Sequence, residues 1–82
     1  MAEVLVQFDS PLADENGRLH DARVCGALAE DGLWDGWIEF APRDGGPTLR
    51  TPRETEQPNL TDLEYWATGL TVGYLEGALR RA

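Results

Sequence analysis

The side chains that could act as nucleophiles are few in this chain. Apart from threonines and tyrosines they are Ser10, His20 and Cys25, each present once. Ser10 stands before a proline and His20 before an aspartate, as ordinary loop residues do, so the sequence does not favour a catalytic triad. Cys25 falls within an expected strand. Arg23, two residues away on the same face, could lower its thiol pKa, but a small, half-buried structural residue is the simpler interpretation.

The fifteen carboxylates are spread along the whole chain and do not define a metal site. The turn around Asp14 and Gly17 resembles a calcium loop, but the first and last ligand positions of such a loop would fall on Leu12 and Arg23. Glu54 and Glu56 are expected to share a strand face, where they could bind a cation, yet the sequence between them offers no further ligand. We therefore expect no cofactor and no metal, and a non-enzymatic role is favoured.

Charge and composition exclude several classes of partner. The net charge is −8 and all seven cations are arginine, so a nucleic-acid backbone would be repelled, and lysine-dependent phosphate-loop or Schiff-base chemistry is excluded. No apolar run approaches the ~18 residues of a membrane span, and a lone cysteine cannot form an internal disulfide. We expect a cytoplasmic protein that binds neither membrane nor nucleic acid.

The hydrophobic pattern predicts one α+β domain over residues 1–82. Alternating apolar residues indicate four strands, which short connections would join as an antiparallel meander. Proline restricts the fourth strand to an edge or an irregular position. The expected strands cover residues 1–9, 19–30, 33–40 and 48–56.

The last third of the chain predicts two short helices, at about 61–68 and 72–81. One apolar stripe ends at Leu70 and another begins on a different side, and Gly69 with Thr71 suits a helix end followed by a new start. Either Asn59 or Thr61 could cap the first helix. We expect the helices to pack on one face of the sheet.

Strand alternation then divides the remaining apolar residues between two faces. We call the face turned away from the helices the open face. The residues expected beneath the helices are Val4, Val6, Phe8, Val24, Leu28, Trp34, Ile38, Phe40 and Leu49. The residues expected on the open face or its rim are Glu3, Leu5, Arg23, Cys25, Ala27, Asp35, Trp37, Glu39 and Arg50.

Several segments read together resemble a group of small uncharacterised bacterial proteins. The resemblance spans most of the chain and implies no activity, so it assigns no functional residue. The segments that carry it are Cys25–Gly26, Glu30–Phe40, Arg53–Asn59, Asp62–Thr71 and Tyr74–Leu79.

A large aromatic among small apolar residues, with arginine at the rim, is the composition of a protein interface. The alternative is that Trp37 forms no interface and only shields the sheet by packing over neighbouring side chains. The sequence favours a protein-interaction module or accessory subunit, acting through the open face on a protein partner or as a homodimer. The alternatives are a small-molecule binder or enzyme, with its site between sheet and helices or between protomers, and an acidic nucleic-acid mimic.

Overall fold

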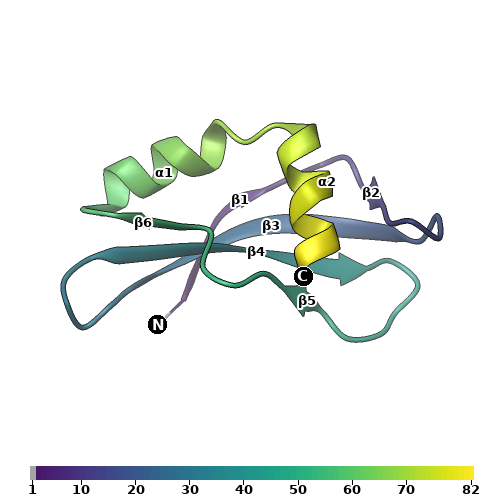
Figure 1. Ribbon diagram of the computed structural model, residues 1–82, viewed down its shortest axis with the longest axis horizontal. Helices are drawn as coiled ribbons and strands as arrows, with labels where there is room; N and C mark the ends of the chain where they lie inside the picture. The colour runs from purple at the N-terminus through teal and green to yellow at the C-terminus, as the bar shows by residue number, and fades with distance from the viewer. Residues whose placement is uncertain (1) are drawn as a thin grey trace.

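The computed structural model describes residues 2–82, in which two helices lie over one face of an antiparallel sheet (Figure 1). The α+β class is therefore confirmed. The elements in chain order are β1 (Glu3–Gln7), β2 (Leu12–Ala13), β3 (Leu19–Leu28), β4 (Trp34–Pro42), β5 (Leu49–Arg50), β6 (Thr55–Gln57), α1 (Leu60–Thr68) and α2 (Val72–Arg81).

The sheet has six strands, so the expected number of four is wrong, but the strands form four rows. The two long strands β3 and β4 pair from His20 opposite Pro42 to Leu28 opposite Trp34. Each outer row is broken in two: β1 and β2 pair with β3, and β5 and β6 pair with β4. Pro11 and Pro52 lie in these breaks, since proline has no amide hydrogen to donate to a ladder. The expected first strand began at Met1, which lies outside the described residues.

The break between the helices is confirmed. The side chain of Asn59 accepts a hydrogen bond from the amide of Asp62 at 2.8 Å, so Asn59 is the N-cap of α1. Thr71 caps α2 by accepting from the amide of Tyr74 at 3.2 Å. Two capped starts within one segment explain why the apolar stripe changes sides.

The core lies between the helices and the central strands. Leu63 of α1 sits on Gly26 and Gly36, which are paired across β3 and β4; a Cβ atom on Gly26 would lie 2.5 Å from Leu63 Cδ2. The glycines therefore allow α1 to approach the sheet closely. The main cluster of buried residues comprises Leu12, Ala22, Val24, Ile38, Phe40, Ala67, Leu75, Ala78 and Leu79.

A β-bulge in the first strand overturns its expected alternation. Val4 pairs with Cys25 and Val6 with Val24, so Leu5 is the extra residue on β1. Because a bulge shifts the register by one, Val4 lies on the open face with Cys25, and Leu5 packs against the core. Glu3 pairs with Gly26, which lies beneath α1. The expected faces of Glu3, Val4 and Leu5 are therefore all wrong.

Leu28 was expected in the core but is 56% exposed. It ends β3 opposite Trp34, at the hairpin that extends beyond α1 in Figure 1. Trp34 is only partly buried.

Between Ala2 and Ala82, neither helix is long and apolar enough to cross a membrane.

Candidate interaction surface

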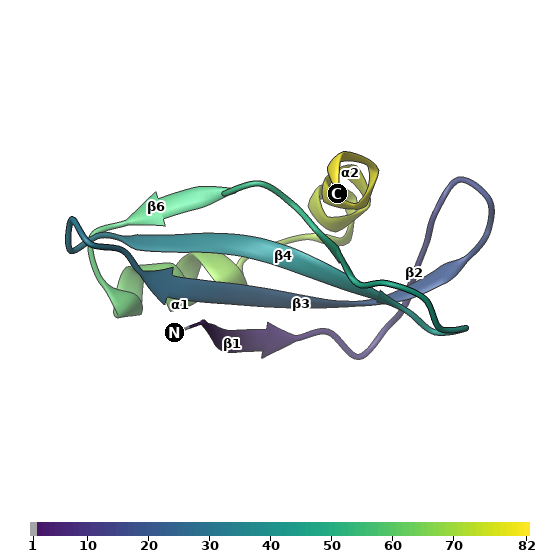
Figure 2. The same ribbon diagram turned by 90° about the horizontal axis from the view of Figure 1, so that it is seen from below.

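The open face is the side of the sheet that carries no helix, and in Figure 2 the central strands lie in front of α1. Strand pairing places Arg23, Cys25 and Ala27 of β3 beside Glu39, Trp37 and Asp35 of β4. Arg50 of β5 pairs with Glu39. Seven of the eight principal expected surface residues therefore lie together on this face: Arg23, Cys25, Ala27, Asp35, Trp37, Glu39 and Arg50. The eighth, Leu5, does not, because of the bulge.

Trp37 is at the centre of this face, yet it is only 4% exposed. The guanidinium carbon of Arg50 lies 4.0 Å from the centre of the indole ring, within cation–π range. The indole Nε1 donates a hydrogen bond to Glu39 Oε2 at 3.0 Å, and Cys25 is the cross-strand neighbour of Trp37. The chain therefore buries its own tryptophan beneath a charged side chain.

Arg23 and Glu39 complete the cover of Trp37 and Cys25. Arg23 donates from Nε and Nη2 to Glu39 Oε1, at 2.9 and 2.6 Å. The hydrogen bond from Trp37, followed by those from Arg23, lowers the pKa of Glu39, and the bond to Glu39 raises the pKa of Arg23.

Cys25 does not have the lowered pKa that its arginine neighbour suggested. Its side chain is buried, at 3% exposure, and this burial raises the pKa of the thiol. Desolvation outweighs the nearby guanidinium, because the thiolate would have to carry its charge away from water. The geometry favours the structural interpretation of Cys25.

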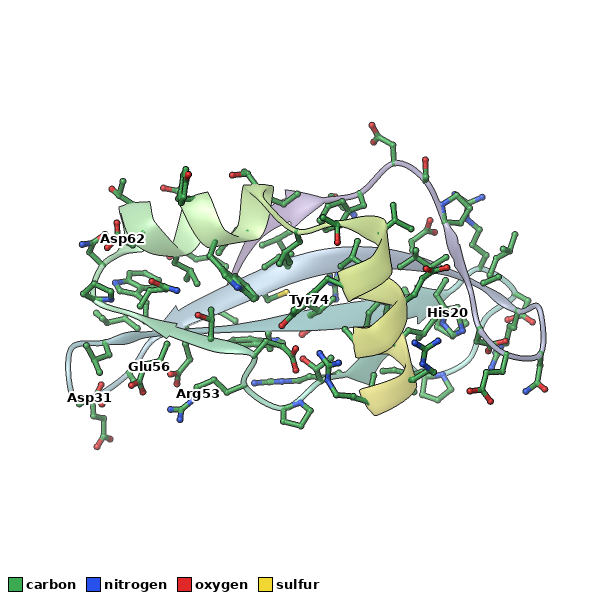
Figure 3. All side chains as sticks on the ribbon, turned by 45° about the horizontal axis from the view of Figure 1, so that its top comes forward. His20, Asp31, Arg53, Glu56, Asp62 and Tyr74 are labelled. Atoms are coloured by element: carbon green, nitrogen blue, oxygen red, sulfur yellow. The ribbon has the colours of Figure 1, made fainter. Side chains whose placement is uncertain are left out.

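Two further arginines form ion pairs on the open face. Arg43 Nη2 lies 3.0 Å from Asp21 Oδ1. Arg53 donates to Glu56 Oε2 at 2.8 Å and lies 3.5 Å from Asp35 Oδ1, an oxygen that is shielded from solvent but has no hydrogen bond. Arg53 and Glu56 project from the β6 edge of the sheet in Figure 3.

The charges on this face cancel, although the chain as a whole is strongly acidic. Four arginines contact or flank four carboxylates there: Arg23, Arg43, Arg50 and Arg53 with Asp21, Asp35, Glu39 and Glu56. The other three arginines and eleven carboxylates of the sequence carry the whole net charge of −8. The open face is thus a neutral, cross-linked patch on an acidic protein.

The structure places two of the candidate nucleophiles on opposite faces of the sheet. His20 and Cys25 lie five positions apart in β3 and so point to opposite faces. His20 is 1% exposed, and its Nε2 is 3.1 Å from Asp14 Oδ2, whereas Ser10 lies in an exposed bend. Residues 2–82 hold no group of three or more metal-binding side chains.

Glu54 and Glu56 do not share a face, because an irregular segment separates β5 from β6. Glu56 pairs with Asp35 on the open face. Glu54 turns toward α2, where the hydroxyl of Tyr74 donates to its Oε1 at 2.7 Å and Arg81 also hydrogen-bonds to it. Figure 3 shows Tyr74 pointing from α2 toward the sheet. No spacing in the sequence indicated this contact, since its partners come from a loop and a distant helix.

Burial of Tyr74, together with its bond to Glu54, raises the pKa of the phenol. The same carboxylate raises the pKa of Arg81. The side chain of Glu54 is only 8% exposed, so this cluster fastens the end of α2 to the loop before β6. Its groups are engaged with one another, which makes it a structural contact.

Comparison of the chain with protein-family models, curated proteins and solved structures found no match. The resemblance to a bacterial group therefore stays a prediction.

Proposed function

We propose that this chain is a small protein–protein interaction module that associates with a second copy of itself through the open face. The main support for this proposal is the distribution of charge, because the open face is neutral on a chain of net charge −8. Two copies that met through their acidic surfaces would repel each other, and like charges brought together cost free energy. The open face is the broad sheet surface on which that repulsion is smallest.

The alternation of charge on the open face suits contact between identical copies. In a two-fold interface the same patch meets itself, so each arginine can lie opposite a carboxylate of the other copy. Arg23, Arg43 and Arg53 have side chains that are 40–57% exposed and can make such contacts while keeping their present partners. The flat guanidinium of Arg50 over Trp37 is a further group of the kind enriched at interfaces.

The expected affinity is modest. A standard interface covers about 800 Å² on each partner, and the chain has a total accessible surface of 5029 Å². Most of the apolar area on the open face is already buried under Arg50 and Glu39. The large apolar residues left exposed there are Val4 and Leu19, at 54% and 42%. We expect a dimer with a Kd roughly in the micromolar to millimolar range.

The test compares Val4→Glu with Val72→Glu. Both residues are exposed valines, at 54% and 62%, but Val4 lies on the open face and Val72 at the start of α2. Sedimentation velocity over a concentration series should show the wild type and Val72→Glu moving from 9.1 kDa toward twice that mass. Val4→Glu should stay monomeric, because it puts a carboxylate into the contact.

A wild type that stays monomeric at millimolar concentration would contradict self-association. Equal association of the two valine variants would show that the dimer uses another surface. If the wild type is monomeric but a different protein binds it and is lost with Val4→Glu alone, the open face is an interface for that partner and not for a second copy.

A further inference from the structure

A groove on the helix side of the sheet lies between α2 and the segment that follows β2. None of the arginines and carboxylates of the open face lines it. Its volume is about 260 Å³, and it is lined by the turn that follows β2, by β5 and by the last turns of α2. Leu49 and Leu79 supply its apolar part, and Glu15, Glu76 and Arg80 supply charged groups around it. The groove is smaller than the ~300 to 1,000 Å³ of typical ligand pockets, so a ligand that fits it must be a small molecule.

The wall formed by the turn is held in place by a dense set of hydrogen bonds. Asp14 Oδ1 accepts from the amides of Asn16 and Arg18, both at 2.9 Å, and Oδ2 lies 3.1 Å from Nε2 of the buried His20. The bond to His20, followed by that to the Arg18 amide, lowers the pKa of Asp14. Asp14 is thus an ionised structural group, and it leaves the other charged residues to meet a ligand.

Those other charged residues are unpaired within residues 2–82. Glu76 and Arg80 are four residues apart on α2, with the acid nearer the N-terminus, which is the favourable arrangement for a helical ion pair. Neither forms a salt bridge or side-chain hydrogen bond in the described chain, and both are exposed. Glu15, on the turn, is likewise exposed. A carboxylate and a guanidinium thus stand one helical turn apart beside an apolar surface.

We infer that this groove binds a small zwitterion with an apolar body, the chemistry of a free aliphatic α-amino acid. Glu76 or Glu15, which both line the groove, receives the ammonium group, and Arg80 binds the carboxylate through its planar fork of donors. The aliphatic side chain packs on Leu49 and on the small part of Leu79 that is exposed. The site is independent of the open face and is complete within one copy of the chain.

The first experiment is an NMR titration of the ¹⁵N-labelled protein with leucine. Amide shifts should change around Leu49, Leu79 and the Asp14 turn. Binding should be weak and approach saturation only at tens of millimolar leucine, because exposed ion pairs contribute little. Three probes each lack one feature of leucine: glycine has no apolar body, isoamylamine has no carboxylate, and 4-methylpentanoate has no ammonium group. Each should bind at least threefold more weakly than leucine.

The second experiment uses Glu76→Gln and Arg80→Gln, with Glu64→Gln as the matched control on the exposed side of α1. Both groove variants should weaken leucine binding about three- to fivefold, and the control should leave it unchanged. All three positions are exposed, so the spectrum of the free protein should change only near the substitution.

Absence of shifts with leucine, or shifts that lie outside the groove, would overturn the proposal. Equal binding of isoamylamine and leucine would overturn the zwitterionic ligand class, as would a normal affinity in Arg80→Gln.

Discussion

The two faces of the sheet bury their central residues by different means. On the helix side, Val24, Ile38 and Phe40 have no measurable exposure, because α1 and α2 cover them with apolar side chains. On the open face, Trp37 is almost as well buried, but its cover is Arg50 and a hydrogen-bonded carboxylate. Strand alternation thus assigns a residue to a face, whereas its burial depends on what covers that face.

This second kind of burial has a physical basis in the arginine side chain. A guanidinium is weakly hydrated and planar, so it can stack on an aromatic ring while its edge remains in water. In a chain of 82 residues the helix-side core is small, and a tryptophan covered in this way adds buried apolar area without a third layer. Side-chain packing on the open face therefore contributes to the stability of the fold.

The comparison predicts that Trp37 contributes more to stability than Trp34. Trp37→Ala should lower the free energy of unfolding by about 3 to 5 kcal/mol, since it removes a buried aromatic together with its hydrogen bond. Trp34→Ala should cost about 1 to 2 kcal/mol, because Trp34 is only partly buried. Denaturant titration of the three proteins at a concentration where all are monomeric measures both losses. A larger loss for Trp34→Ala would show that the open face adds little stability.

The sequence alone would give the opposite order for the two tryptophans. Alternation correctly places Trp37 on the open face, and the local rules for capping and glycine correctly break the helical segment after Gly69. The cover over Trp37 depends on Arg50, which reaches it by pairing of β5 with β4. Such a contact between distant segments leaves no periodic signal in the chain.

The misplacement of Leu5 has a different cause. A bulge needs no special residue, and a single extra position reverses the faces of every residue before it. The candidate surface was therefore predictable along the regular pairing of β3 and β4 and failed on the irregular first strand. The cluster of Glu54 with Tyr74 and Arg81 was missed for a related reason, since Glu54 lies in an irregular loop.

The helix side should be the less tolerant of added volume. Gly26→Ala would place a Cβ atom 2.5 Å from Leu63 Cδ2 and 3.2 Å from the carbonyl oxygen of Asp35. We expect a loss of about 1 to 3 kcal/mol, as for other overpacked cores. Gly73→Ala is the control, since the nearest atom to its added Cβ is 4.0 Å away. Gly73 lies in the first turn of α2, so the substitution should stabilise the protein by less than the ~1 kcal/mol of a helix-interior position. A neutral Gly26→Ala would mean that α1 can move away from the sheet at little cost.

The pH dependence of stability tests whether the charge of Glu39 helps to cover Trp37. The hydrogen bonds from Trp37 and Arg23 hold the pKa of Glu39 below its ordinary value of 4.5, so the folded state favours the ionised carboxylate. The stability that Glu39 contributes is therefore complete above that value and is lost as the pH falls through the lowered pKa.

Glu39→Gln isolates this contribution, because it keeps the shape of the side chain but cannot ionise. At neutral pH the variant should be less stable than the wild type by about 1 to 2 kcal/mol. This is the low end of the ~1.5 to 3 kcal/mol typical of hydrogen bonds to a charged group, because the amide oxygen of glutamine still accepts a hydrogen bond. The difference should shrink toward zero in acid, where Glu39 of the wild type is also uncharged. Asp14, whose pKa is lowered too, affects both proteins equally and cancels. Urea titrations of both proteins from neutral to acidic pH give the difference directly. A difference that does not change with pH would mean that the charge of Glu39 does not stabilise the packing of Trp37. Both faces would then be stabilised by packing alone.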